Sequence, residues 1–328
     1  LERYVGEAAP GVPASERTLW PIASISKTFT AAMLLRLVEL GELSVQTHVR
    51  AALPSFTGEG REEMRLRHLL THTSGLRYES PEFEARLRAH TSLASLTDEA
   101  MSAPLLFRPG TRFRYSDDAF LIAARMAETV TGRPYATLVE ELVIGPMGLR
   151  DAHVVPPVEL HDRLAYVSGV PAEGSDGAMY DSPYARALGH PAFSVVTSAR
   201  DLLRFASFFA DGGPRIHAEA TVRACRVSQT GEVPGEHPIS TGYGSDARIP
   251  WSYVWSLQTP QVPAILSELA SFEAFGHPGA SGCHVVVDPV SATSIVVMTN
   301  AHGSRDFDTW FRRQQRLLAA AFVEAERR

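Results

Sequence analysis

The stretch Pro21-Ile22-Ala23-Ser24-Ile25-Ser26-Lys27-Thr28-Phe29 decides how this chain is interpreted, because it contains the only lysine of the sequence. Of the 31 Lys and Arg residues, all but Lys27 are arginine. A GC-rich coding genome favours arginine codons, which explains why lysine is rare but not why the remaining one stands here. Arginine stays protonated at usable pH, whereas a partly buried lysine can release its proton. A lone lysine three positions after Ser24 therefore indicates chemistry that needs a removable proton.

The segment Ser24–Leu40 is predicted to form a helix, since its apolar residues recur at helical spacing and Gly41 follows as a stop signal. Ser24 and Lys27 would then lie one turn apart at the helix N-terminus, where backbone N–H groups are unpaired and the helix dipole is positive. A serine hydroxyl becomes a nucleophile when a base removes its proton, and a desolvated lysine near positive charge can be that base. Ser-x-x-Lys also occurs by chance on solvated helices, so other parts of the chain have to support this interpretation.

Length and composition describe an ordinary globular protein and exclude several classes of function. The chain has 328 residues, enough for about two domains, with 45% hydrophobic and 21% charged residues. The net charge of −6 is spread along the chain without a basic stripe, which argues against a nucleic-acid partner. No run approaches the roughly 18 apolar residues of a membrane span. The two cysteines, Cys225 and Cys283, are far apart and lack zinc spacing, so neither a disulfide framework nor a structural metal is expected.

The chain begins inside what looks like a strand and ends in strand and helix signals, so its two ends are expected to share one sheet. The sheet domain is predicted to comprise residues 1–48 and 236–328, with its N-terminal strand hairpin incomplete. Residues 49–235 are predicted to form a mostly helical domain, with an irregular loop at His161–Gly189 and a connector at Arg223–Ser245. The active site would lie between the two domains. The clearest expected elements are three helices and two strands, at Asp118–Gly132, Thr197–Phe209, Phe307–Glu326, His284–Val287 and Ser294–Met298.

Tyr115 is a candidate proton-transfer residue. It lies in the run Phe113-Arg114-Tyr115-Ser116-Asp117, on a loop between a Pro-Gly turn and the helix predicted from Asp118. A tyrosine at this place could pass a proton to a leaving group. On its own, it would be interpreted as a surface residue.

The run His277-Pro278-Gly279-Ala280 is a candidate substrate-binding segment at the start of the C-terminal strands. The glycine lets backbone approach a substrate closely, and the N–H groups of Ala280 and Ser24 could form an oxyanion hole. On its own, this segment is a Gly-rich turn into a strand.

The order Ser-x-x-Lys, Tyr-Ser-Asp and His-Pro-Gly resembles the penicillin-binding protein and serine β-lactamase superfamily. It is most similar to the class C β-lactamase-like proteins, which include D-alanyl-D-alanine carboxypeptidases, D-aminopeptidases, family VIII carboxylesterases and acyltransferases. The similarity extends over nearly the whole chain. The resemblance implies an α/β (α+β) fold, with an antiparallel sheet flanked by helices plus a mostly helical domain. The supporting runs are Ile22–Thr30, His68–Leu76 (His-Leu-Leu-Thr-His-Thr-Ser-Gly-Leu), Arg108–Asp117 and Thr197–Phe205.

The resemblance also implies a role for each motif. Ser24 would be the acylated nucleophile, Lys27 its general base and Tyr115 a proton relay. No metal or other cofactor is implied. The residues implied for binding the substrate and its oxyanion are Ser24, Ala280, His277, Gly279 and Asp117.

Three features depart from the pattern that the resemblance implies. Asp117 stands where the family has asparagine, so an amide donor is lost and an ionised carboxylate, which only accepts, takes its place. Asp117 could stabilise protonated Lys27, which would work against the lysine as a base. His277 replaces a lysine, which weakens the fixed positive charge that would hold a substrate carboxylate. The first strand hairpin of the family is expected to be incomplete before Leu1.

Several other features have plain structural interpretations. His68 and His72 have the spacing of metal ligands on a helix, but no third ligand accompanies them. Gly279 to Cys283 faintly resembles a nucleophile elbow, yet Cys283 occupies the place of the closing glycine and is expected to be a small core residue. Three aromatic residues could line an apolar acyl pocket or belong to the core: Trp251, Tyr253 and Trp255.

Together these observations favour a serine hydrolase, and among its substrates a small-molecule ester more than an amide, which makes a carboxylesterase the leading prediction. A D-amino-acid peptidase or carboxypeptidase, or an acyltransferase, is the alternative within the family. A catalytically weak binding or scaffold protein is the alternative of a different class. The sequence leaves the oligomeric state open, and also the compartment, which would be the bacterial cytoplasm or an exported location reached with an upstream signal.

Overall fold

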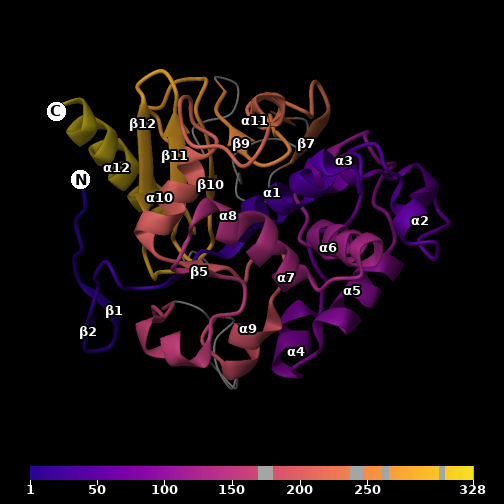
Figure 1. Ribbon diagram of the computed structural model, residues 1–328, viewed down its shortest axis with the longest axis horizontal. Coiled ribbons are helices and arrows are strands. Elements are labelled where there is room, and N and C mark those ends of the chain that lie inside the picture. Colours follow the sequence, from indigo (N-terminus) through magenta and orange to yellow (C-terminus); the bar gives the residue numbers. More distant parts are fainter. Residues whose placement is uncertain (169–179, 237–246, 260–265, 303–306, 328) are drawn as a thin grey trace. The chain divides into compact units, whose positions relative to one another are not determined.

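A computed structural model shows that the chain divides into two compact units, each made of separate stretches of sequence (Figure 1). The residues described are 1–168, 180–236, 247–259, 266–302 and 307–327. Unit 1 comprises Leu1–Ser26, Ile144–Ile216 and Ala264–Arg328. Unit 2 comprises Lys27–Val143 and His217–Pro263.

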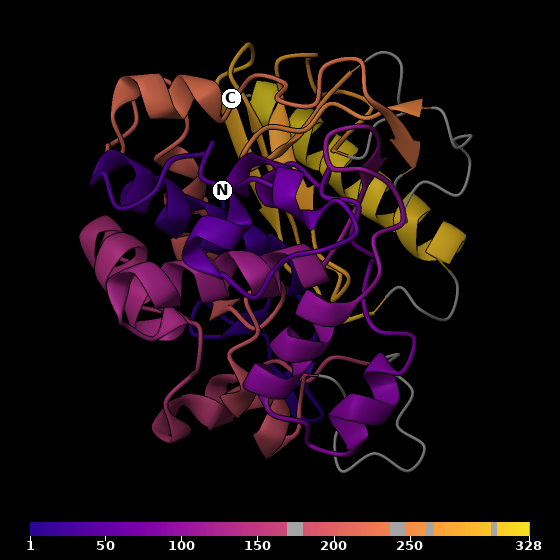
Figure 2. The ribbon, with the colours of Figure 1, turned by 90° about the vertical axis from the view of Figure 1, so that its right-hand side faces the viewer.

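Unit 1 is built on an antiparallel sheet in which β11 (His284–Asp288) pairs with β10 (Phe275–Pro278) on one side and β12 (Thr293–Val297) on the other. The helix α12 (Phe307–Glu326) covers one face of this sheet (Figure 1 and Figure 2). Its Leu318 and Phe322 side chains pack against buried strand residues that share one face, Val286 and Ile295. Burial of this apolar surface, at about 25 cal/mol per Å², holds the helix on the sheet.

The helix α10 (Ala199–Ser207) lies on the opposite face of the same sheet, because its residues line a pocket with Val296 and Met298. Side chains alternate between the two faces of a strand, so Val296 points away from the face that α12 covers. Ser198 caps α10 by accepting the N–H of Asp201 at 3.2 Å. The predicted C-terminal strands, the predicted closing helix and the predicted helix capped near Ser198 are all confirmed.

A second sheet, besides the packing of α10, connects residues 144–216 to unit 1. In it, β6 (Val196–Thr197) pairs with both β3 (Trp20–Pro21) and β5 (Ala152–His153). The sequence-based division had placed all of residues 49–235 in the helical domain. Short strands of two residues carry no periodicity, so this pairing could not be detected in the sequence.

The N-terminal segment contains a small hairpin, formed by β1 (Glu7–Ala9) and β2 (Val12–Pro13). The first six residues form no strand, contrary to the expectation that the chain starts inside one.

Unit 2 is mostly helical. Its longest helices are α1 (Ser26–Glu39), whose first residue belongs to unit 1, and α6 (Asp118–Thr131). Gly132, with φ +68°, caps the C-terminus of α6, which confirms the helix predicted over Asp118–Gly132 to within one residue. A small sheet joins β7 (Pro234–Glu236) in parallel to β4 (Phe113–Arg114) and antiparallel to β8 (Ala247–Arg248). The other elements of unit 2 are α2 (Val49–Ala52), α3 (Leu66–Leu70), α4 (Phe83–Arg88), α5 (Leu93–Ser102), α7 (Tyr135–Val139), α11 (Glu219–Ala224) and β9 (Ser256–Leu257).

Two segments predicted to be irregular contain regular structure. The predicted loop His161–Gly189 overlaps a 3₁₀ helix at Val158–Arg163 and the helix α9 (Pro183–Leu188), whose N-terminus is capped by Ser182. The predicted connector Arg223–Ser245 contains β7. Residues 169–179 and 237–246 of these segments lie outside the described residues. Among the helices that are described, none is both long and apolar enough to cross a membrane.

Candidate active site

Ser24 lies in a tight turn that leads directly into α1. The turn is a 3₁₀ helix, Ala23–Ile25, and α1 follows at once from Ser26, so the predicted helix begins with a more tightly wound segment than expected. Ala23 has φ +45°, a left-handed conformation that costs a residue with a side chain about 1–3 kcal/mol. Ser24 itself is largely buried, with 9% of its surface exposed.

The third motif packs against the backbone that precedes Ser24. The Gly279 N–H donates to the Cys283 carbonyl at 2.7 Å, and a Cβ at Gly279 would lie 2.3 Å from the Ile22 carbonyl oxygen. Ala280 packs on the cluster that contains Ala23. Glycine is therefore required at position 279, and the sequence-predicted oxyanion segment lies beside the turn that carries Ser24.

His277 is buried in β10, with 1% of its surface exposed. Its Nδ1 lies 2.6 Å from the Pro278 carbonyl oxygen. A carbonyl only accepts, so the Nδ1 atom carries a proton and donates it in this contact. A role for His277 in holding the substrate stays a prediction.

Lys27 is the centre of a buried cluster in unit 2. Only 1% of its surface is exposed, and its Nζ lies 2.8 Å from Asp117 Oδ1 in an ion pair. The same nitrogen lies over two aromatic rings, 4.7 Å from the centroid of Tyr115 and 5.7 Å from that of Phe120. Both the carboxylate and the ring faces attract a cation. The structure thus brings together the lysine of the first motif and the tyrosine and aspartate of the second.

The charge on Lys27 is set by opposing effects. Burial acts to lower the pKa of Lys27, but the negative charge of Asp117 and the contact with Tyr115 outweigh it, so this pKa is raised overall. Burial raises the pKa of Asp117, and the neighbouring Lys27 opposes that change only in part. Lys27 is therefore a cation at rest, and it has to lose a proton before it can accept one from a serine.

Tyr115 is a core residue, with 2% of its surface exposed, whereas its sequence context alone had indicated a surface position. It follows β4 and belongs to an apolar cluster with Phe113, Ile249 and Trp251. Its ring also stacks on the ring of His72, with the centroids 4.2 Å apart and the planes 22° from parallel. Trp251 and Trp255 are both buried, in agreement with the core interpretation of these aromatic residues.

Acidic residues missed by the sequence analysis surround this cluster. Glu79 is half-buried, and burial together with the charges of Asp117 and Asp118 raises its pKa to about 8. Burial raises the pKa of Asp118 to about 6, although Arg77 Nε lies 2.8 Å from its Oδ2 atom. The Ser-Asp-Asp run at the start of α6 was the signal that could have indicated this concentration of negative charge.

His68 and His72 do not share a helix face, because α3 ends at Leu70. His68 Nδ1 accepts the N–H of Arg65 at 3.2 Å and so caps α3, whereas His72 lies beyond the helix with φ +56°. Each histidine therefore has its own structural contact. Cys283 is a buried free thiol whose pKa is raised to about 11 by burial, as suits a core residue.

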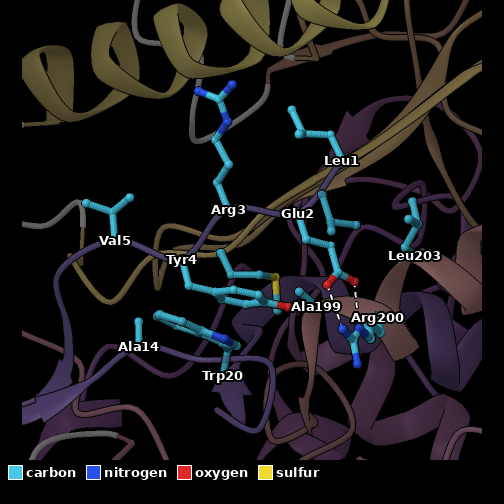
Figure 3. A pocket seen from close by; sticks show the side chains of 12 residues that line it. Leu1, Glu2, Arg3, Tyr4, Val5, Ala14, Trp20, Ala199, Arg200 and Leu203 are labelled. Carbon is cyan, nitrogen blue, oxygen red and sulfur yellow. Dashed lines mark hydrogen bonds and ion pairs between the residues drawn. The ribbon is translucent and has the colours of Figure 1, made fainter.

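Unit 1 also contains a pocket of about 140 Å³ (Figure 3). Trp20 and Leu203 contribute apolar walls, and Arg200 forms a two-fold ion pair with Glu2, with distances of 2.6 and 2.7 Å. None of the candidate catalytic residues lines this pocket.

Comparison with known proteins identifies relatives of this chain. A family model described as Beta-lactamase matches residues 1–319. Penicillin-binding protein 4 of Amycolatopsis lactamdurans is 25% identical over 319 residues, which cover 91% of this chain and 76% of that protein. Esterase EstB of Burkholderia gladioli is 34% identical over 176 residues, which cover 49% of this chain but only 45% of the esterase.

Solved structures share the fold. The structure of EstCE1, described as a hydrolase with promiscuous acyltransferase activity, matches with a TM-score of 0.74 at 22% identity, covering 94% of this chain and 88% of that one. A penicillin-binding protein homologue from Caulobacter crescentus matches with a TM-score of 0.73 at 23% identity, covering 97% and 87%. The expected fold class, with antiparallel sheet flanked by helices, is confirmed.

Proposed function

This chain belongs to the beta-lactamase family, and from that premise we propose that it is a carboxylesterase that forms an acyl-enzyme at Ser24. Membership of this family makes it a serine hydrolase. The observation that carries the finer proposal is the buried contact between Lys27 and the pair Asp117 and Tyr115. Three residues suited to moving a proton meet there, and one of them, Lys27, follows Ser24 by three positions in the chain.

In the proposed reaction, Ser24 Oγ attacks the carbonyl carbon of an ester while its proton passes to Lys27. The N–H groups of Ser24 and Ala280 stabilise the oxyanion that develops. The carbon–oxygen bond of the leaving group then breaks, and Tyr115 relays the proton to the departing alkoxide. Water attacks the acyl-enzyme by the same route in reverse, which releases the acid and restores Ser24.

The resting charge of Lys27 adds one step to this scheme. The carboxylate of Asp117, at 2.8 Å, is the acceptor for the lysine proton, because burial lowers the free energy needed to convert the resting ion pair into two neutral groups. The reactive form is therefore the pair of neutral lysine and protonated aspartic acid. Asp117 replaces the amide that the resemblance implies and supplies this acceptor in its place.

Covalent labelling tests the nucleophile. A fluorophosphonate should modify Ser24 in the wild type, as located by peptide mass spectrometry, and Ser24→Ala should abolish it. Ser26→Ala is the matched control, since Ser26 is a buried neighbour whose Oγ accepts the Val195 N–H at 2.9 Å. Labelling at another serine would reject Ser24 as the nucleophile, and no labelling would indicate a binding or scaffold protein.

A substrate panel tests the preference for esters. Wild type and Ser24→Ala are assayed with p-nitrophenyl esters, D-Ala-D-Ala peptides and nitrocefin. Esters should be cleaved fastest, because the buried His277 provides a weaker anchor for a substrate carboxylate than a lysine would. Faster cleavage of the D-Ala-D-Ala peptides would instead identify a carboxypeptidase.

A further inference from the structure

We propose that His72, which the catalytic scheme does not use, is a positioning residue that fixes Tyr115 beside Lys27. The inference rests on the proposed function, because it assigns to His72 the placement of the proton relay. His72 is fully buried, and its ring stacks on the ring of Tyr115. Its carbonyl oxygen and its ring Nδ1 accept the N–H groups of the two residues that flank Tyr115.

The backbone on both sides of Tyr115 is held by His72. The Arg114 N–H donates to the His72 carbonyl oxygen at 2.8 Å. The Ser116 N–H donates to His72 Nδ1 at 3.0 Å. Two hydrogen bonds to one residue thus enclose the tyrosine, and neither of its two neighbours in the chain can shift without breaking one of them.

The imidazole also fixes the phenol ring itself. The two rings stack with centroids 4.2 Å apart, and Trp251 stands edge-on to the imidazole at 4.8 Å. Stacked and edge-on ring contacts of this kind are favourable beyond the area they bury. Because the same phenol ring lies 4.7 Å from Lys27 Nζ, a rotation that broke the stack would also displace the ring from the lysine.

The hydrogen bond from Ser116 defines the protonation state of His72. Since Nδ1 accepts, it carries no proton, and the proton of the neutral ring is on Nε2. A doubly protonated ring would turn an N–H toward another N–H and place a second cation in the cluster that holds Lys27. His72 is therefore suited to positioning and not to accepting the serine proton.

The backbone of His72 is in an unfavourable conformation for a residue with a side chain. Its φ of +56° lies in the left-handed region, which is strained for most residues that have a Cβ. Asparagine and glycine adopt this region more easily. Two substitutions can therefore remove parts of the side chain without adding backbone strain.

The test compares His72→Gly with His72→Asn. Glycine removes both the acceptor and the ring, whereas asparagine keeps a side-chain oxygen that can accept the Ser116 N–H. We expect His72→Gly to lower kcat for a p-nitrophenyl ester by about 10²-fold with KM nearly unchanged, since a misplacement of about 1 Å costs that much. His72→Asn should recover at least about tenfold of the loss, because each tenfold step needs only about 1.4 kcal/mol. The pH profile of kcat should change shape in His72→Gly, because its relay is displaced.

Matched controls are His68→Gly and His68→Asn. His68 is a buried histidine of the same run that also accepts a backbone N–H through Nδ1, but it caps α3 and has no ring contact with Tyr115 among the described ring pairs. These variants should lose thermal stability and keep the wild-type kcat and pH profile.

The inference is wrong if His72→Gly folds and keeps the wild-type kcat. It is also wrong if the His68 variants, or His72→Asn, lose as much kcat as His72→Gly does. If the wild type labels at Ser24, these outcomes reject the role of His72 alone. If the wild type does not label there, the proposed function fails, and the role of His72 fails with it.

Discussion

Replacing Asp117 with asparagine tests two effects of its ion pair with Lys27. The pair keeps the lysine protonated, and it stabilises the fold. In the wild type the buried carboxylate holds Lys27 as a cation, so its raised pKa has to be overcome before it can act as a base. Asp117→Asn removes the charge and keeps the shape. Breaking one partner of a buried ion pair costs about 3–5 kcal/mol, because an uncompensated charge stays buried. Lys27 can escape this cost only by losing its proton, which in the variant goes to solvent because the Asp117 acceptor is gone, and neutral Lys27 is the form that the reaction needs.

The expected change in activity follows from that energy. The lower limit of this cost is about 3 kcal/mol. If only one third of it, about 1 kcal/mol, favours deprotonation of Lys27 in the variant, kcat/KM on the acidic side of the pH profile rises about fivefold. The acidic limb of the profile should therefore move to lower pH in Asp117→Asn. The measurement is kcat/KM for a p-nitrophenyl ester from pH 5 to pH 10, corrected for uncatalysed hydrolysis.

The expected change in stability has the opposite direction at low pH. A raised folded-state pKa of Lys27 means that the wild-type pair stabilises the fold below the unfolded pKa of lysine and loses this contribution as pH rises through the folded value. In Asp117→Asn, burial lowers the pKa of Lys27 and only the contact with Tyr115 still opposes it, so the variant should be least stable in acid and approach the wild type at alkaline pH. Chemical denaturation at pH 5, 7 and 10 measures the difference. An acidic limb that moves to higher pH, or a stability loss independent of pH, would refute the reasoning.

Three further outcomes are expected. Lys27→Arg should keep the ion pair and the fold but lower fluorophosphonate labelling by about 10²–10⁴-fold, since arginine cannot take up a proton; full labelling would exclude Lys27 as the base. Gly279→Ala should lower esterase activity at least tenfold, because the Cβ of the alanine would lie 2.3 Å from the carbonyl oxygen of Ile22, two residues before Ser24. Unchanged activity would show that the position of Gly279 does not affect Ser24. The thiols of Cys225 and Cys283 should resist a thiol reagent in the folded protein and react after denaturation, since both are buried and burial raises the pKa of Cys283 to about 11.

The parts of the fold that the sequence predicted are those with a periodic pattern. The helix that ends at Gly132 and the closing helix from Phe307 were correct because apolar residues repeat along each of them. The pairing of Trp20–Pro21 with Val196–Thr197 was not foreseen, since two residues show no period. This pairing and the packing of α10 on the sheet both connect residues 144–216 to unit 1.

The candidate site divides in the same way. The resemblance indicated Lys27, Tyr115 and Asp117, and even that an aspartate could hold the lysine as a cation, but only coordinates gave the 2.8 Å contact. His72 was considered as a metal ligand because its spacing from His68 fits a helix. The helix α3 ends before His72. The stack of His72 on Tyr115 joins residues far apart in the sequence, and no local sequence pattern predicts such a contact.

The burial of the only lysine has a practical consequence for anyone who handles this protein. Amine-reactive reagents such as succinimidyl esters and dialdehydes find no lysine amine at the surface of the native fold, because the Lys27 side chain is 2% exposed. Modification of that amine therefore becomes a direct signal that the start of α1 has opened. An endoproteinase specific for lysine would cut the denatured chain once, after Lys27. The amount of the two fragments would then measure the fraction of molecules in which this segment has unfolded.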